Sequence, residues 1–278
     1  MRTTAPPPSR ASLPAIIGTL TILVIAAACS SAPGATTHEA GPRGGTQLGE
    51  GPSAAPPAGS RKVGFEALDG VALEGRLFGS GTTGVVLAHM GNAGDSQADW
   101  YGVADVLADH GYAVLTFDRR GVCPGGVDGC SSGSDDYLNH WEDVVGAVRF
   151  LNGKGIERVF VGGASIGAMA SFYAAERPEA DVAGVIWVSG LDFASGYHFE
   201  RSDVRRVDVP KLFVSASRDP YGAAASARRL YRWAAPPKRL VVLQSGEHGT
   251  DMLSDPAALE TAEALTRSIV GFVGRYSR

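Results

Sequence analysis

Short apolar runs alternate with helical patterns of apolar residues through residues 61–278. Uninterrupted short runs are typical of strands buried on both faces, and apolar residues three and four positions apart are typical of helices with one buried face. Such alternation predicts an α/β domain with a mostly parallel sheet and helices on both of its faces. The strands are expected at residues 62–68, 71–78, 85–88, 113–117, 156–161, 182–188, 212–215 and 239–243. The helices are expected at residues 100–110, 138–151, 166–176, 223–233 and from Asp255 onward.

Turn and cap signals refine the two ends of this domain. Asp69 and Gly70 separate the first two predicted strands, so these strands are expected to pair across a tight turn. Asp255 and Pro256 form a good cap and first-turn pair, so the last helix is expected to begin there. The apolar residues of that helix expected to face the core are Leu259, Ala262, Leu265 and Ile269.

Composition narrows the possible function classes. The chain has 278 residues, of which 44% are hydrophobic and 19% charged, so most of it can bury a core. Its 25 Lys and Arg against 29 Asp and Glu give a net charge of −4, and this balance argues against nucleic acid as a main partner. With only three Cys, a cysteine-rich metal site is excluded, and no metal or cofactor is expected.

The first 28 residues have the pattern of an export signal. Arg2 and Arg10 precede an uncharged, mostly apolar run at residues 13–28, which is short for a membrane span. The run ends in three alanines followed by Cys29, and small residues before a cysteine resemble the lipobox of bacterial lipoproteins. That resemblance implies that residues 1–28 are removed and that Cys29 carries lipid. An ordinary secretory signal and an uncleaved anchor are the alternatives.

Residues 29–60 are expected to form a disordered tether that starts at the lipidated cysteine. From residue 30 to residue 60, 25 of 31 residues are Gly, Pro, Ala, Ser or Thr, and Leu48 is the only large aliphatic one. Such a segment cannot bury enough apolar surface to offset the entropy lost on ordering. A lipid on Cys29 and this tether would hold the domain at residues 61–278 on the extracytoplasmic face of the cell membrane.

Two stretches match the G-x-S-x-G pattern of a nucleophilic serine, at residues 163–167 and 129–133. The first directly follows a predicted strand and opens a predicted helix, the setting in which a sharp turn exposes the serine hydroxyl. The second lies in a loop that joins no such elements. Ser165 is therefore the predicted nucleophile, and Ser131 is expected to have no catalytic role.

The sequence resembles the α/β-hydrolase family over nearly all of residues 61–278. Residues 87–91 are similar to the family's strand and oxyanion loop, residues 111–121 to its G-Y-x-V-x-x-x-D-x-R-G stretch, and residues 142–145 to the helix that follows. The likeness is greatest to the dienelactone-hydrolase-like and serine-aminopeptidase-like branches. It implies an α/β-hydrolase fold with a minimal cap, because residues 189–211, where the family inserts caps, leave room only for a short flap.

The family order of nucleophile, acid and histidine places the other two members of a catalytic triad. Asp219 follows the strand predicted at residues 212–215, and His248 follows the last predicted strand. Histidine suits proton transfer near neutral pH, and an aspartate beside it holds the imidazole tautomer and stabilises the imidazolium. Asp192, which follows another strand, is the alternative acid.

The resemblance also implies two backbone donors for the oxyanion. One is the N–H of Ile166, directly after the nucleophile, and the other is the N–H of Met90 or of Gly91. Met90 stands where many members of the family have glycine. His89 is expected to stabilise this loop rather than to act as a base, and Asp118 is expected to hold its own loop.

Two loops near the predicted site carry further expectations. Cys123 and Cys130 are expected to form a disulfide beside the entrance of the site if the protein is exported. The acidic residues around them match no calcium loop and are expected to be solvated: Asp128, Asp135 and Asp136. The aromatic residues of the short flap are expected either to line the site or to pack in the core: Phe193, Tyr197 and Phe199.

These residues together predict a lipid-anchored, extracytoplasmic serine hydrolase that acts on a small-molecule ester or other acyl substrate. Ser165 would attack an ester, thioester or amide carbonyl, and water would release the acyl-enzyme. A carboxylesterase is the preferred subclass. A peptidase or an acyltransferase would use the same triad, and a catalytically silent binding module on the same fold is the remaining alternative.

Overall fold

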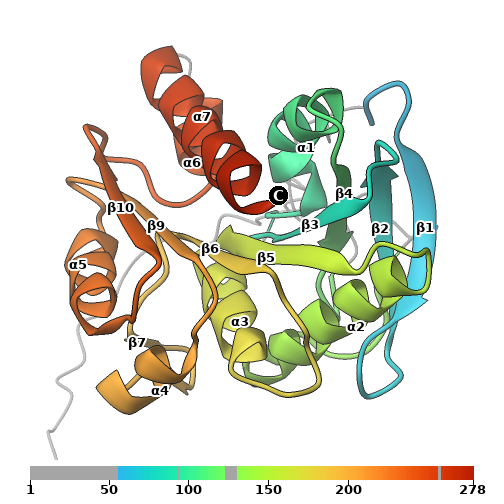
Figure 1. The fold of residues 1–278 in the computed structure, drawn as a ribbon, viewed down its shortest axis with the longest axis horizontal. Coiled ribbons are helices and arrows are strands. Elements are labelled where there is room, and N and C mark those ends of the chain that lie inside the picture. The colour runs from blue at the N-terminus through green and yellow to red at the C-terminus, as the bar shows by residue number, and fades with distance from the viewer. Residues whose placement is uncertain (1–55, 93, 123–129, 256–257) are drawn as a thin grey trace, which may run out of the picture. The chain divides into compact units, whose positions relative to one another are not determined.

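A mixed sheet lies at the centre of the fold. The computed structural model describes residues 56–92, 94–122, 130–255 and 258–278. Within these residues, eight strands pair in the order β1-β2-β4-β3-β5-β6-β9-β10 (Figure 1). The pairs β1–β2 and β2–β4 are antiparallel, and all other neighbours in this sheet are parallel. The strands are β1 (Arg61–Glu66), β2 (Ala72–Phe78), β3 (Thr83–Ala88), β4 (Ala113–Asp118), β5 (Arg158–Ala164), β6 (Gly184–Val188), β9 (Lys211–Ala216) and β10 (Lys238–Leu243).

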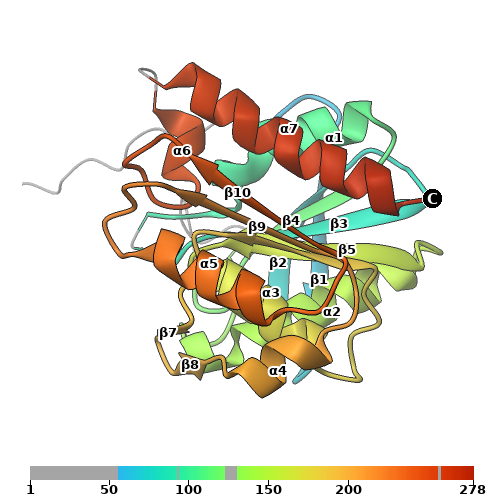
Figure 2. The same cartoon turned by 60° about the vertical axis from the view of Figure 1, so that its left-hand side comes forward.

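Helices cover both faces of this sheet. One face carries α1, α6 and α7, and the other carries α2, α3 and α5, as Figures 1 and 2 show from two directions. The described helices are η1 (Gln97–Trp100), α1 (Tyr101–Asp109), η2 (Tyr137–Asn139), α2 (His140–Asn152), α3 (Ile166–Ala175), α4 (Arg201–Arg206), α5 (Ala223–Trp233), α6 (Asp251–Ser254) and α7 (Leu259–Tyr276).

The central strands supply side chains to two separate cores. In β6, Val185 and Trp187 pack in the core on the α2 and α3 face, whereas Ile186 and Val188 pack in the core on the α1 and α7 face. Successive side chains of a strand point to opposite faces, so a strand covered on both sides needs apolar residues at every position. This explains why the inner strands are mostly apolar in the sequence, with Thr116 in β4 and Ser215 in β9 among the buried polar exceptions.

The carboxyl ends of the parallel strands place several loops along one edge of the sheet. The segments that follow β3, β5, β6, β9 and β10 begin at this edge. In Figure 2 the edge is on the left, where α6 and the small β7–β8 hairpin lie. Ligands of such sheets bind at this edge, and all the predicted catalytic residues lie in these segments.

The pattern of strands and helices agrees with the sequence prediction, with differences at the ends of two helices. α7 begins at Leu259 rather than at Asp255, because Asp255 instead follows the last residue of the short helix α6. Leu259 is 67% exposed, while Leu265 and Ile269 are buried as predicted. Leu259 is the first residue of α7, and at about 100° per residue it lies roughly 120° around the helix from Leu265. Leu138, where the next helix is expected to begin, lies instead in η2, before α2 begins at His140, and is 50% exposed.

The short flap between β6 and β9 contains elements that the sequence did not predict. A two-stranded hairpin, β7 (Phe193–Ala194) and β8 (Tyr197–His198), is followed by the short helix α4. Tyr197 and Phe199 are each 2% exposed and pack in the core, which decides between their two predicted roles. Phe193 is 71% exposed.

The predicted signal at residues 1–28, Cys29 and the tether as far as residue 55 lie outside the described residues. Their roles remain predictions. In the part of the chain that the structure describes, no helix is both long and apolar enough to cross a membrane.

Candidate active site

Ser165 occupies a strained turn between β5 and α3. Its backbone angles are φ 52° and ψ −119°, a conformation that residues other than glycine rarely adopt. Its N–H donates to the carbonyl of Val188, 2.9 Å away at the end of β6, which fixes the turn to the neighbouring strand. α3 begins at the next residue. Strand, strained serine and helix therefore follow one another as the sequence predicts.

The two glycines around Ser165 allow the turn to pack closely against β3. A Cβ on Gly163 or on Gly167 would lie 2.4 Å from the carbonyl oxygen of Ala88, and one on Gly163 would also lie 2.7 Å from the carbonyl carbon of Gly167. Side-chain atoms do not tolerate such distances from backbone atoms. The glycines of the motif are thus required by close packing at this turn.

His248 and Asp219 form a buried hydrogen-bonded pair. Nδ1 of His248 lies 2.8 Å from Oδ2 of Asp219, and the two side chains are 7% and 0% exposed. The loops after β10 and β9 carry these residues, and the two strands are parallel neighbours. The parallel register brings residues 29 positions apart in the chain together, as the sequence predicts.

The second oxygen of the Asp219 carboxylate is held by the backbone. Oδ1 accepts hydrogen bonds from the N–H of Tyr221 at 3.0 Å and of Ala223 at 3.4 Å. Burial acts to raise the pKa of Asp219, but the hydrogen bond and the charge of His248 and these backbone donors bring its pKa below the ordinary value. Asp219 is therefore suited to remain a carboxylate beside the imidazole.

Contacts between neighbouring residues bring the three candidate segments together. Gly249, next to His248, lies so near β5 that a Cβ there would be 3.2 Å from Cβ of Ala164, the residue before Ser165. Within the described residues no hydrogen bond joins Ser165 Oγ to His248. Hydrogen bonds of this kind are often long before substrate binds. Beside the pair, the ring of Tyr221 makes an edge contact with the ring of His248, with 4.6 Å between centroids.

Arg119 holds the loop that contains the predicted oxyanion donors. We call this loop, residues 89–91, the oxyanion loop. Nη1 of Arg119 donates to the carbonyl of Met90 at 2.6 Å, and Nη2 donates to that of Gly91 at 3.3 Å. The hydroxyl of Tyr137 also donates to the Gly91 carbonyl, at 2.8 Å. These bonds satisfy both carbonyls with donors from Arg119 and Tyr137. Neither the N–H of Met90 nor that of Gly91 donates a hydrogen bond within the described part of the chain.

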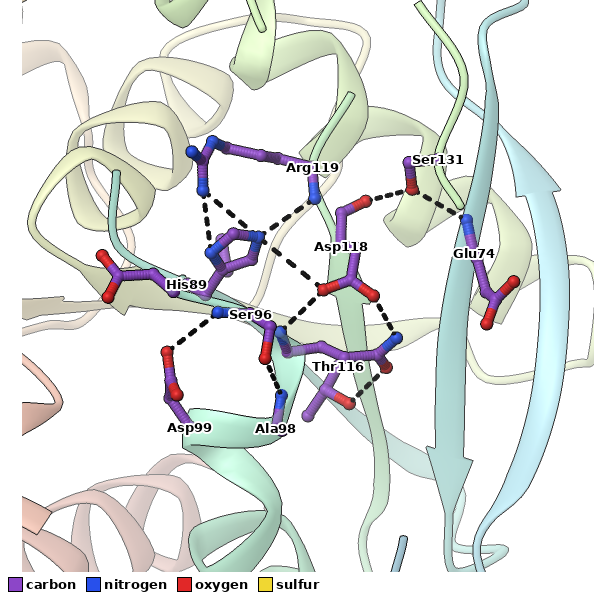
Figure 3. A network of polar contacts seen from close by, with 12 residues as sticks. Glu74, His89, Ser96, Ala98, Asp99, Thr116, Asp118, Arg119 and Ser131 are labelled. Carbon is purple, nitrogen blue, oxygen red and sulfur yellow. Dashed lines mark hydrogen bonds and ion pairs between the residues drawn. The ribbon is translucent and has the colours of Figure 1, made fainter. Parts of the chain in front are cut away.

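His89 is part of this support and not a second base. It is 1% exposed, its Nε2 accepts from the N–H of Arg119 at 3.2 Å, and its Nδ1 lies 2.9 Å from Nη1 of Arg119 (Figure 3). Burial and the nearby Arg119 charge lower the pKa of His89 well below its ordinary value, so the ring is neutral. The predicted structural role of His89 agrees with this geometry.

Asp118 and Ser131 hold neighbouring backbone segments, as Figure 3 shows. The carboxylate of Asp118 accepts from the N–H and the side-chain amide of Gln97, at 2.9 and 2.6 Å. Ser131 donates to the carbonyl of Asp118, and its oxygen accepts from the N–H of Glu74 at 3.0 Å. Burial raises the pKa of Asp118 to about 6. Ser131 is 4% exposed and lies in no strand–turn–helix setting, in agreement with its predicted lack of a catalytic role.

Asp192, the alternative acid, bonds elsewhere. Its carboxylate accepts a hydrogen bond from Ser226 at 2.7 Å and forms an ion pair with Arg229, both on α5. Asp192 thus fastens the segment before β7 to α5. The geometry favours Asp219 over Asp192 as the partner of His248.

Two residues of the network around Arg119, Asp135 and His140, are not predictable from the sequence. Asp135, expected to be solvated, accepts from Nε and Nη2 of Arg119 at 3.0 Å each, and it lies 3.0 Å from Nε2 of His140. Hydrogen bonds and charge from Arg119 lower the pKa of Asp135 despite partial burial, which acts to raise it. Burial lowers the pKa of His140 to about 4. The sequence does not predict that Asp135 and His140 contact Arg119, because a loop separates them from it along the chain.

Two predicted features lie wholly or partly outside the described residues. Cys130 is described and Cys123 is not, so their disulfide remains a prediction; Asp128 is likewise not described. Among the residues that the structure covers, no group of three or more His, Cys, Asp or Glu side chains is arranged to hold a metal ion.

Comparisons with known proteins agree with this architecture. Residues 84–204 match the family model for the alpha/beta hydrolase fold. An esterase from Pyrococcus furiosus is similar at 17% identity and TM-score 0.64, covering 78% of this chain and 91% of that one. A dienelactone hydrolase from Anabaena variabilis is similar at 22% identity and TM-score 0.60, covering 78% and 99%. An alpha-beta serine hydrolase homologue from Coxiella burnetii is similar at 18% identity and TM-score 0.60, covering 74% and 96%. Curated protein sequences give no match.

Proposed function

Since the chain has the α/β-hydrolase fold, we propose that it is a serine hydrolase with Ser165, His248 and Asp219 as its catalytic triad. The observation that supports this most strongly is the buried hydrogen bond between His248 and Asp219, at the edge of the sheet that also carries the strained Ser165 turn. A histidine oriented by a carboxylate close to a half-buried serine turn is an arrangement suited to activate a hydroxyl nucleophile.

The reaction proceeds in two halves. Oγ of Ser165 attacks the carbonyl carbon of the substrate while Nε2 of His248 takes the hydroxyl proton, and a tetrahedral oxyanion forms. The imidazolium then gives this proton to the leaving oxygen as the carbon–oxygen bond breaks, which leaves an acyl group on Ser165. Water attacks the acyl-enzyme with His248 again as base. Breaking of the bond to Oγ returns the proton to Ser165 and releases the acid.

The oxyanion would be bound by two backbone groups. One is the N–H of Ile166, the first residue of α3, where the positive end of the helix dipole adds to the attraction. The other is the N–H of Met90 or Gly91, in the loop whose carbonyls are held by Arg119 and Tyr137. Losing one such donor typically slows an enzyme by about 10²–10³-fold.

A carboxylesterase is the preferred subclass, with a small-molecule ester as substrate. The similar solved structures include an esterase and a dienelactone hydrolase, which supports ester hydrolysis over other acyl chemistry. The flap between β6 and β9 is short, which suits a substrate that needs no large cap. Peptidase and acyltransferase activities use the same groups with a different acyl donor or acceptor.

The proposal extends to where the enzyme works. Its support is the apolar run at residues 13–28 that ends in Cys29, together with the low-complexity composition of residues 30–60. We place the domain outside the cytoplasmic membrane, attached by lipid on Cys29, where oxidising conditions would favour a disulfide between Cys123 and Cys130. Intact-mass measurement of the protein from its native membrane should find a chain that starts at a lipid-bearing Cys29. A chain that starts elsewhere or lacks lipid would contradict the anchor.

A fluorophosphonate probe tests the catalytic proposal, because it reacts covalently with an activated serine. The purified full chain is treated with the probe, and the adduct is located by mass spectrometry of its peptides. We expect labelling at Ser165 that is lost in Ser165→Ala and retained in Ser131→Ala, the matched change in the second G-x-S-x-G stretch. A well-folded chain that does not label at Ser165 would instead favour the catalytically silent binding module.

A further inference from the structure

The side chain of Met90 lies against the loop that carries His248. Met90 is 1% exposed, and the N–H of Thr250 donates to its Sδ at 3.4 Å. Gly249, between His248 and Thr250, lies so close that a Cβ there would be 2.2 Å from Sδ and 3.1 Å from Cγ of Met90. The peptide that follows His248 is therefore in direct contact with the thioether.

Gly249 suits this contact because it has no side chain and because its backbone conformation favours glycine. Its φ of +56° lies in the left-handed region, which disfavours residues with a Cβ. A Cβ there would also lie 3.2 Å from Cβ of Ala164, the residue before Ser165. The loop with His248 can approach the nucleophile turn because position 249 has no side chain, and Met90 fills the space on its other side.

The backbone of Met90 is fixed independently of its side chain. Nη1 of Arg119 donates to its carbonyl at 2.6 Å, and Arg119 is itself held by two hydrogen bonds to Asp135. Met90 thus has its backbone in the oxyanion loop and its side chain against the loop with His248. A movement of either loop relative to the other must displace this one residue.

We propose that the Met90 side chain is a positioning residue, which sets the location of His248 relative to Ser165 and the oxyanion donors. The inference rests on the proposed hydrolase function. An unbranched thioether adapts to an irregular gap, and here it fills the gap between two loops. Catalysis is sensitive to this spacing, since a displacement of about 1 Å can slow a reaction by about 10²-fold.

The contact predicts a specific pattern of coupling between positions 90 and 249. Met90→Ala leaves a void beside the loop of His248, while Gly249→Ala forces a methyl group into the Met90 sulfur. In the double variant the methyl group introduced at position 249 occupies space that the thioether has vacated. The two changes should therefore compensate each other, as neighbouring substitutions do when they share a contact.

The experiment measures hydrolysis of p-nitrophenyl acetate by the full chain and the rate of fluorophosphonate labelling at Ser165. Met90→Ala is expected to lower kcat about tenfold with KM within about twofold, because it disturbs the reacting groups rather than substrate binding. Gly249→Ala is expected to lower kcat about 10²-fold, and adding Met90→Ala to it should restore activity about tenfold or more.

Two further variants distinguish an effect on the position of His248 from a general loss of stability. Leu107→Ala truncates a fully buried residue of the same core cluster on α1, and it should destabilise the fold while leaving kcat of the folded enzyme unchanged. Met90→Leu keeps the volume, so it should retain kcat within about threefold even if Met90→Ala does not fold.

The outcomes distinguish this inference from the function on which it rests. Wild-type chain that does not label at Ser165 removes the hydrolase proposal and this inference together. If the wild-type chain labels, the inference alone is overturned by either of two results. One is a double variant whose loss equals the product of the two single losses, and the other is a loss of kcat in Met90→Leu as large as that in Gly249→Ala.

Discussion

Two adjacent arginines after β4 are equally buried but serve different parts of the molecule. Arg119 is 5% exposed and Arg120 is 4% exposed. Arg120 bonds to carboxylates: its Nε donates to Asp143 at 2.8 Å, and its two terminal nitrogens donate to Asp69 at 2.8 and 3.0 Å. Arg119 divides its side-chain contacts between one carboxylate, Asp135, and the oxyanion loop, where it meets the ring of His89 and the carbonyls of Met90 and Gly91.

The two arginines are equally buried, so their different roles follow from their different hydrogen-bond partners. Arg120 links the turn between β1 and β2 to α2, where its partners Asp69 and Asp143 lie, so its bonds secure the fold. Arg119 donates to the carbonyls of Met90 and Gly91, so its bonds hold the loop whose N–H groups are proposed to bind the oxyanion. The same substitution should therefore lower stability more at Arg120 and lower activity more at Arg119.

The largest expected effect is the loss of stability in Arg120→Met. The side chain of Asp143 is fully buried, so removal of Arg120 leaves a buried carboxylate without its cation. Breaking such a pair costs about 3–5 kcal/mol in the free energy of unfolding, which at this chain length lowers Tm by roughly 10 °C. The folded fraction should retain its rate of fluorophosphonate labelling at Ser165. Thermal unfolding and labelling well below Tm check the two statements, and slow labelling at unchanged Tm would contradict them.

Arg119→Met should have the opposite pattern, with a large loss of activity and a smaller loss of stability. Without Arg119 the carbonyls of Met90 and Gly91 are free to turn toward the site, which disturbs the N–H groups proposed to bind the oxyanion. We expect kcat to fall about 10²-fold while KM changes little. The free energy of unfolding should fall by less than in Arg120→Met, because Asp135 is 34% exposed and can be hydrated. Labelling of the folded protein as fast as in Arg120→Met would show that Arg119 is only structural.

The sheet and the serine turn are predictable from the sequence because both depend on local pattern, whereas Asp219 is predicted from the order of triad residues in the family that the sequence resembles. Apolar runs mark the inner strands, and the order of strands along the chain sends the loops after β9 and β10 to one edge. The contact between Asp219 and His248 follows from two parallel neighbours.

The network around Arg119 could not be predicted, because its members come from separate loops. Asp135 is acidic in a polar loop, and such residues are usually solvated. Whether it meets Arg119 depends on the path of the chain between them, which no local pattern encodes. The same holds for the contact of Met90 with Gly249 and Thr250, which joins residues about 160 positions apart.

The buried His140 should make the stability of the fold depend on pH. The pKa of His140 is lowered to about 4 in the folded chain by burial, against about 6.5 when unfolded. Between these values the unfolded chain binds more protons, so stability falls as the pH drops from about 6.5 toward 4. His140→Gln should reduce this loss by about 3 kcal/mol. Denaturant unfolding at several pH values measures it, with the exposed His110→Gln as control. An unchanged pH dependence in His140→Gln would show that this histidine is not buried in its neutral form.

The smallest expected effect concerns the second donor to the Gly91 carbonyl. Tyr137→Phe removes one hydrogen bond of 2.8 Å and keeps the ring, while Arg119 still donates to the same oxygen at 3.3 Å. Because one donor remains, kcat should fall only about threefold, whereas Tyr173→Phe, whose hydroxyl makes no hydrogen bond among the described residues, should have no effect. If the two donors hold the carbonyl as a unit, Tyr137→Phe should cost little more once Arg119→Met is present. Losses that multiply independently would show that Tyr137 acts on the loop by a separate route.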